Sequence, residues 1–263
     1  MKLKKLIFSI LLTSIYVLTI NAQNNNAIEQ KLVQTYNLFS TASQQDEKND
    51  EIKTLFRTDL QDALLNHFDL KYPFEQLGEK ITITSSEDKK LRIFSWDNFN
   101  GGTWHDFQSI FQYQETPNSP LKIYSEKISE TEATSSEEKL LYSDVSWYKI
   151  ESIATATHPN QYLIFGYGTH GSGNDFFTLE VIRLEAGNFS ICPDCINGQS
   201  TFTTFKSRSD DQAPQYDPTT KKVQIKEYKE DPKTGNYISS GKIISLKFND
   251  KKSVFIVDKS AKK

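Results

Sequence analysis

The feature that most constrains the fold is a long succession of short segments rich in β-branched and aromatic residues, running over residues 79–258. Gly, Asn, Asp or Pro bounds most of these segments, as is typical of strands. Parallel strands need long crossover connections, usually helices, and few helical patterns occur here. The order therefore favours an antiparallel meander. The expected strands cover residues 81–84, 91–96, 103–114, 121–128, 145–156, 161–169, 176–184, 201–206, 222–228, 236–248 and 253–258.

Two amphipathic helices are expected before the strands, within residues 28–72. The first carries apolar residues at three- and four-residue spacing: Ile28, Leu32, Tyr36 and Phe39. The second covers residues 51–70, with Asp50 as its expected N-cap and Pro73 beyond its end. The predicted class is α+β, an N-terminal helical pair followed by a long antiparallel β-meander. The meander could form a curled sheet, a sandwich or an open barrel.

Residues 1–22 have the pattern of a secretory signal peptide. Positive Met1–Lys5 precedes apolar Leu6–Ile20, and Ala22 supplies the small residue expected at a cleavage site. A membrane anchor is the alternative, but the apolar run is short for a spanning helix. We therefore expect an exported protein that is periplasmic, at the cell surface or extracellular, with one mature α+β domain over residues 23–263.

The charge of the chain argues against a nucleic-acid partner. The full sequence has 31 basic and 34 acidic residues, a net charge of −3. Removing the signal peptide removes three lysines and no acid, which leaves 28 basic against 34 acidic residues and a charge of −6. Nucleic-acid binders are normally basic.

The acidic segment 129–139 is expected to be an exposed loop, and the mature chain is expected to be a monomer without a membrane span.

A predicted hairpin over residues 91–113 carries the first candidate site. Its connection contains Gly101 and Gly102, which permit a backbone with positive φ. Five side chains would gather beside this connection: Trp96, Asp97, Trp104, His105 and Asp106. An indole face beside carboxylates suits a sugar ring or another small polar ligand. The structural alternative makes both tryptophans sheet and core aromatics, with the polar residues serving the turn.

The same stretch resembles a family of secreted bacterial proteins of unknown function. These proteins carry a strand, then "SWD…GGT", then a second aromatic-rich strand, and the corresponding residues here are Leu91–Asp97 and Gly101–Trp104. The resemblance covers about residues 75–115, and Tyr162–Leu184 more loosely. It implies export and an aromatic hairpin, and it assigns no activity.

A glycine-rich stretch, Gly166–Asp175, is the second candidate. It would expose His170 and Asp175, which together with His105 favour an alternative interpretation as an exported hydrolase. The Gly-x-Ser-x-Gly pattern of a nucleophile elbow is absent, and the order of elements is strand to strand rather than strand to helix. A hairpin loop is therefore the favoured interpretation.

Cys192 and Cys195 form a Cys-Pro-Asp-Cys motif. In an exported chain the favoured interpretation is a disulfide that closes a turn, while redox and metal roles remain alternatives. The four histidines are not spaced as metal ligands. We expect no metal and no cofactor.

The sequence predicts an exported, non-enzymatic binding protein for a small polar ligand such as a glycan. Two alternatives stay open: a hydrolase with a His/Asp site, and a structural or protein-interaction module.

Overall fold

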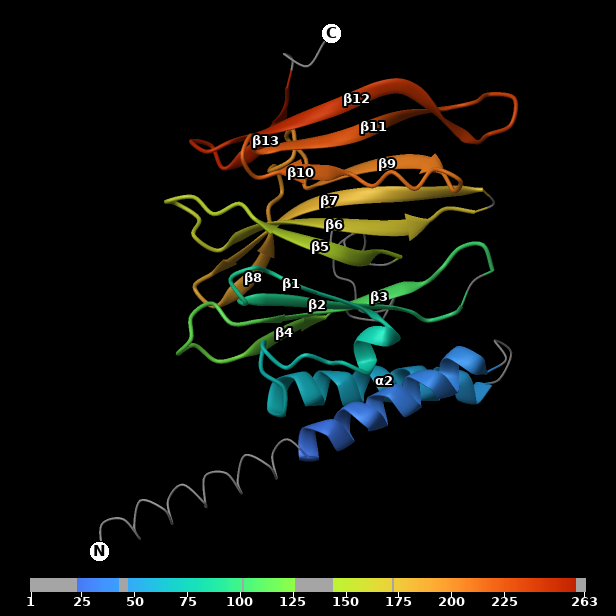
Figure 1. Cartoon of the computed structure of the whole chain (residues 1–263), viewed down its shortest axis with the longest axis vertical. Coiled ribbons are helices and arrows are strands. Elements are labelled where there is room, and N and C mark those ends of the chain that lie inside the picture. Colours follow the sequence, from blue (N-terminus) through green and yellow to red (C-terminus); the bar gives the residue numbers. More distant parts are fainter. Residues whose placement is uncertain (1–22, 43–46, 101, 126–143, 172, 259–263) are drawn as a thin grey trace, which may run out of the picture. The chain divides into compact units, whose positions relative to one another are not determined.

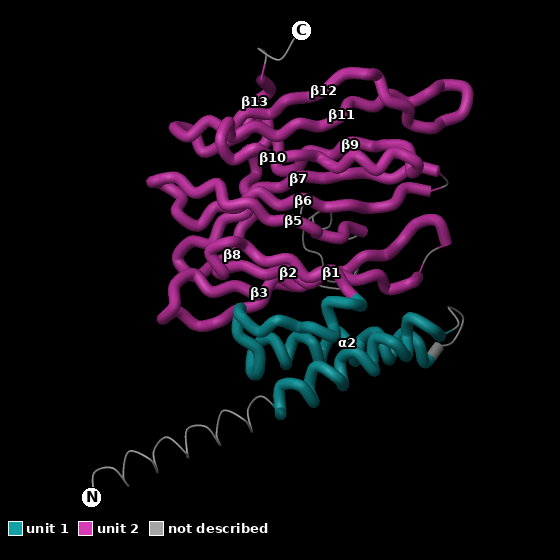
Figure 2. Tube along the Cα trace, in the orientation of Figure 1, with its two compact units in different colours: residues 1–80 teal, residues 81–263 magenta. Residues whose placement is uncertain are grey.

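The computed structural model describes residues 23–42, 47–100, 102–125, 144–171 and 173–258. The chain divides into two compact units, residues 1–80 and residues 81–263 (Figure 2). The predicted signal peptide and the acidic segment 129–139 lie outside the described residues.

The first unit contains the predicted helical pair. One helix covers residues 23–41 and the other, α2, covers Glu47–Asn66, followed by the short 3₁₀ turn η1, Leu77–Glu79. Three aromatic rings join the two helices, because Tyr36 and Phe39 of the first lie 5.5 Å, between ring centroids, from Phe56 of the second. Asp50, the expected N-cap, lies inside α2 instead.

A buried carboxylate fastens the first helix to the segment after the second. Glu29 is 2% exposed and accepts hydrogen bonds from the Tyr72 hydroxyl at 2.8 Å and from the backbone N–H groups of Gln76 and Leu77 at 2.8 and 2.9 Å. Two effects raise the pKa of Tyr72: burial, which is the larger, and the hydrogen-bonded Glu29 carboxylate. Two of these three bonds satisfy backbone donors where η1 begins, which a buried turn requires.

The second unit consists of antiparallel strands in three open sheets, which confirms the α+β class (Figure 1). The first sheet contains β1 (Thr82–Ser85), β2 (Leu91–Asp97), β3 (Phe107–Tyr113) and β4 (Lys122–Ser125). The second contains β5 (Ser146–Ser152), β6 (Gln161–Thr169), β7 (Asn174–Glu185), β8 (Asn188–Ile191) and β9 (Thr201–Ser207). The third contains β10 (Gln215–Asp217), β11 (Lys222–Glu230), β12 (Tyr237–Asn249) and β13 (Val254–Val257).

The second sheet is the middle layer of this unit. On one face of β6, Tyr162 and Ile164 pack with apolar residues of the first sheet, and on the other face Leu163 and Phe165 pack with apolar residues of the third. Successive residues of a strand point to opposite faces. A strand covered on both sides is therefore apolar throughout, which is why β6 lacks alternation.

Two details differ from the expectation. Residues 215–217, which lie outside the strands expected from the sequence, form β10, which pairs with the start of β11. Residues 188–191 form an additional strand, β8, which follows a two-residue turn at Ala186 and Gly187. Both turn residues have positive φ, 51° and 73°, as a type I′ hairpin requires.

Candidate functional site

Three connections, one from each sheet, meet at one end of the second unit (Figure 1). They follow β2, β6 and β11. The backbone N–H of His105 donates to the Thr169 hydroxyl at 2.7 Å, which joins the first connection to the end of β6. Asn174 donates to the Gly235 carbonyl at 3.3 Å and accepts from the Tyr237 N–H at 3.2 Å, which joins the second sheet to the third. Residues far apart in sequence thus form one surface.

Arg208, just after β9, fixes two of these connections to each other. One guanidinium nitrogen, Nη2, donates to the carbonyls of Thr103 and Gly171, both at 3.1 Å, and Nε donates to Asp175 at 3.0 Å. Thr103 precedes Trp104 and Gly171 follows His170 in the chain. Arg208 therefore fixes the backbone beside both aromatic candidates.

The Asp175 carboxylate is buried, with 2% of its side chain exposed. It accepts from the Tyr167 hydroxyl at 2.7 Å, and the buried ammonium of Lys206 lies 3.8 Å away. Burial, followed by the hydrogen bond to Asp175, raises the pKa of Tyr167. Among the described residues, the bonds of Asp175 reach Tyr167 and Arg208, and not a histidine. Asp175 thus holds Tyr167 and Arg208 in place from a buried position.

Four aromatic rings form a row across this end of the unit. Trp104 lies 5.1 Å from His170, His170 lies 4.9 Å from Phe205, and Phe205 is stacked on Tyr237 at 5.1 Å, all between ring centroids. The first two rings are exposed and the last two are half-buried. We call these four residues the aromatic row. Trp104, at one end of the row, is 47% exposed.

Trp96 and Trp104 occupy opposite environments. Trp96 is 2% exposed, and its indole N–H donates to Asn98 at 3.0 Å, so its ring lies in the interior. Asn98 in turn donates to Asp106 at 3.2 Å, as does Asn100 at 2.5 Å. The Trp104 ring instead remains half-exposed, and it lies near Asp144, whose pKa burial raises and Trp104 lowers.

His105 is held from several sides. Its Nδ1 lies 2.5 Å from the carboxylate of Asp97, the last residue of β2, and its ring is stacked on Phe107. The other carboxylate oxygen of Asp97 accepts from the Phe99 N–H at 2.7 Å. The His105 side chain is 41% exposed. His105 thus pairs with Asp97 of β2 and not with Asp106, its neighbour in the connection that precedes β3.

The glycines of the second candidate serve packing as well as turning. Gly166 and Gly168 belong to β6, so the connection itself covers only residues 170–173. A Cβ atom built on Gly168 would lie 2.1 Å from the Phe176 ring and 2.5 Å from the Asp144 carbonyl oxygen. No larger residue fits that space. Gly168 therefore lets Asp144 approach the site closely.

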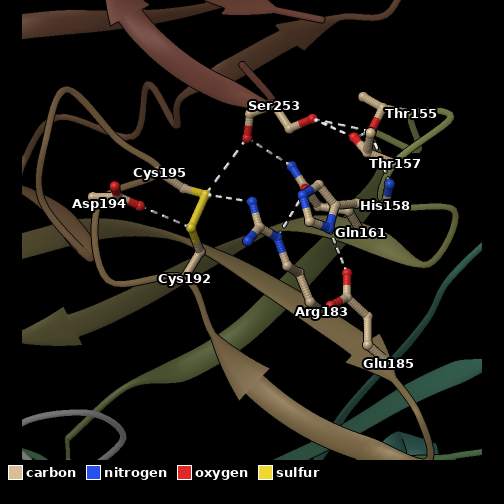
Figure 3. Close-up of a disulfide and its surroundings, with 10 residues drawn as sticks. All are labelled: Thr155, Thr157, His158, Gln161, Arg183, Glu185, Cys192, Asp194, Cys195 and Ser253. Atoms are coloured by element: carbon tan, nitrogen blue, oxygen red, sulfur yellow. Dashed lines mark hydrogen bonds and ion pairs between the residues drawn. A yellow bond between two sulfur atoms is a disulfide. The ribbon is translucent and has the colours of Figure 1, made fainter. Parts of the chain in front are cut away.

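The predicted disulfide between Cys192 and Cys195 is present (Figure 3). Arg183 Nη2 lies 3.2 Å from Cys195 Sγ, and the Cys195 carbonyl accepts from the Phe255 N–H at 2.7 Å. The disulfide thus closes a local turn after β8, and the backbone bond from Phe255 joins that turn to β13 of the third sheet. The Asp194 carboxylate and the two sulfurs lie within 4.8 Å of one another, but bonded sulfurs offer no thiolate to a metal ion.

Sequence reasoning found part of this site. Trp104, His105 and His170 were expected to be exposed at strand connections, and the structure brings them together with the buried Asp175. The residues from other segments that complete the site could not be identified in this way: Asp144, Phe205, Lys206, Arg208 and Tyr237. Residues 207–219 lie outside the strands expected from the sequence, and a single arginine there gives no signal of its partners.

Comparison of the chain with protein-family models, with curated proteins and with solved structures found no match. Across the parts of the chain that the structure describes, no helix is both long and apolar enough to cross a membrane.

Proposed function

We propose that this chain is an exported binding protein whose ligand, a glycan or another small polar molecule, stacks on Trp104 at the end of the aromatic row. The observation that carries the proposal is the half-exposed indole of Trp104, whose ring lies 5.1 Å from the exposed His170 ring, between centroids, at the end of the aromatic row. A rigid aromatic face with polar neighbours binds a sugar ring by apolar contact and orients it through its hydroxyls.

The surroundings of Trp104 support a small polar ligand. Arg208 and His105 provide donors within the connected loops, and Asp106 provides an acceptor. Arg208 is held by three hydrogen bonds, and such preorganisation reduces the entropy lost on binding. Export behind the signal-peptide pattern of residues 1–22 belongs to the same proposal and gives the site access to ligands outside the cytoplasm.

A binding screen tests this function. The mature chain, its Trp104→Ala variant and an Ile243→Ala variant are titrated against one panel of glycans and small polar compounds by calorimetry. Ile243 is 49% exposed on the third sheet and serves as a matched control. We expect at least one compound to bind the parent and Ile243→Ala equally and to lose tenfold or more in affinity with Trp104→Ala. Equal affinity of all three proteins for every binding compound would exclude the site.

A second candidate function rests on the pairing of His105 with Asp97. A carboxylate that orients a partly exposed imidazole is the arrangement of a general base. A hydrolase would therefore cleave one of a panel of chromogenic esters and glycosides, and Asp97→Asn and His105→Gln would both abolish that activity. Turnover that survives both substitutions would remove this candidate. If no compound binds in the screen and no substrate is cleaved, the results would instead favour a structural or protein-interaction module.

A further inference from the structure

The third sheet forms an outer layer of the second unit (Figure 1). Its inner face packs on the middle sheet through Ile244 and Leu246 of β12 and Phe255 of β13. Because successive residues of a strand point to opposite faces, Ile243 and Ile256 point away from the middle sheet. Both side chains are exposed, at 49% and 44%.

Ile238, near the start of β12, points the same way. Tyr237 beside it is stacked on Phe205 of the middle sheet, so the next side chain faces outward. Ile238 is 55% exposed. The described residues contain nine large apolar side chains that are exposed, and three of them are these outward isoleucines. Single apolar residues are ordinary on a surface, whereas a group on one face marks a contact with a partner or a membrane.

A lysine lies directly across from each outward isoleucine on the neighbouring strand: Lys229 from Ile238, Lys226 from Ile243, and Lys247 from Ile256. Residues that pair across two strands share a face, so ammonium groups and aliphatic side chains alternate there. Lys226 is paired with Asp210, whereas Lys229 and Lys247 are exposed. We call Ile238, Ile243, Ile256, Lys229 and Lys247 the Ile–Lys face.

The charge of the chain is distributed unevenly, and the Ile–Lys face belongs to its basic part. Residues 221–258, which form β11, β12, β13 and their turns, contain 9 lysines and 5 acidic residues, a net charge of +4. Residues 23–220 contain 16 basic and 29 acidic residues, a net charge of −13. A basic segment in an otherwise acidic chain points to an anionic partner.

The mixture of side chains distinguishes between anionic partners. The core of a protein interface is depleted of charged residues, whereas isoleucine and lysine alternate on this face. An anionic glycan stacks best on aromatic rings, and the outward apolar residues here are aliphatic. A bilayer surface accepts both kinds of side chain. Aliphatic groups enter the boundary between headgroups and acyl chains, and lysines extend their stems so that the ammonium groups reach the lipid phosphates.

We propose that the Ile–Lys face docks the protein on the surface of a bilayer that contains anionic phospholipids. Ile238, Ile243 and Ile256 enter the headgroup boundary, and Lys229 and Lys247 lie beside lipid phosphates. The attachment is peripheral, because only side chains enter the bilayer. It does not depend on a ligand at Trp104.

Vesicle sedimentation tests the docking. The mature chain is mixed with vesicles of phosphatidylcholine alone, or with vesicles in which half of the lipid is phosphatidylglycerol. We expect affinity for the anionic vesicles to be higher by about tenfold or more. It should fall by about tenfold when the salt is raised from about 0.05 M to about 0.5 M, because salt screens surface charges. Equal affinity for the two kinds of vesicle would overturn the proposal.

Charge reversal locates the contact. The double variant Lys229→Glu/Lys247→Glu should weaken binding to the anionic vesicles by about tenfold or more. Lys71→Glu/Lys89→Glu is the matched control, because both lysines are exposed outside the third sheet and the net charge changes equally. It should weaken binding by less than about threefold. Equal losses in the two double variants would overturn the proposal, because the attraction would then follow net charge and not this face.

The isoleucines are tested separately. Ile238→Ser/Ile256→Ser keeps every charge and should weaken binding by about fivefold or more, because less apolar surface enters the bilayer. Ile243→Trp adds a reporter, whose emission vesicles of brominated phosphatidylglycerol should quench more strongly than that of the parent. Urea unfolding checks that each variant remains folded, as expected for exposed positions. Full affinity of Ile238→Ser/Ile256→Ser, or no added quenching in Ile243→Trp, would overturn the proposal and favour an acidic protein as the partner.

Discussion

The buried carboxylate of Asp175 offers a quantitative test of how the site is built. With 2% of its side chain exposed, it accepts from Tyr167 at 2.7 Å and from Arg208 at 3.0 Å, and Lys206 lies 3.8 Å away with 3% exposed. Hydrogen bonds to charged groups contribute about 1.5–3 kcal/mol each, and breaking a buried ion pair costs about 3–5 kcal/mol. Arg208 is 41% exposed, so solvent screens its share.

Asp175→Asn should therefore destabilise the chain by about 2–4 kcal/mol, because the amide keeps one acceptor for Tyr167 but leaves Lys206 without its counter-charge. Urea unfolding measures this as a lower midpoint at an unchanged slope. Arg208→Ala should cost less, about 1–2 kcal/mol. The double variant should cost less than the sum, because the two residues interact.

Asp250→Asn is the matched control. It removes the partner of Lys221 in a pair whose side chains are 57% and 42% exposed, and such surface pairs contribute less than about 1 kcal/mol. If Asp175→Asn is no more destabilised than Asp250→Asn, burial does not strengthen this cluster and the physical account of the site is wrong.

The remaining predictions concern packing, capping and the disulfide. Gly168→Ala should cost about 3 kcal/mol or more in thermal unfolding, because its Cβ would meet a backbone oxygen at 2.5 Å, whereas Gly102→Ala, with no atom within 4 Å, should stay within about 0.5 kcal/mol. Glu29→Ala should cost about 2–4 kcal/mol by leaving buried donors unpaired, and normal stability in urea would contradict this. Thiol titration of the denatured, unreduced protein should find no free thiol, and replacing Cys192 and Cys195 together by Ser should cost about 2 kcal/mol, since the loop is short.

The order of elements was readable from the sequence because most strands carry local signals. In β11, Val223 and Ile225 face the core while Gln224 and Lys226 alternate with them, which is the pattern of a sheet with one wet face. The run Tyr162–Phe165 lacks alternation because β6 is covered on both sides. A short apolar run does not distinguish a middle-layer strand from other buried segments, so the three-layer arrangement was not predicted.

The candidate site, too, could be predicted only where local patterns reveal it. Trp104 and His170 stood out because aromatic and glycine-rich connections have a recognisable composition. Their partners could not be found from local patterns, because Phe205 and Arg208 are brought in by the pairing of β9 with β7, and Tyr237 comes from β12 of another sheet. Which sheet covers which face depends on long-range packing, and one sequence contains no periodicity that reports it.

The central claim is that Trp104 presents a ligand-binding face at the end of the aromatic row. The most direct measurement follows the indole N–H resonances of Trp96, Trp104 and Trp147 by NMR while the panel of glycans and polar compounds is added, with Trp104→Phe identifying the exposed one. We predict that a binding compound shifts the Trp104 resonance and leaves those of the two buried tryptophans nearly unchanged. A compound that binds the protein without moving the Trp104 resonance would contradict the claim.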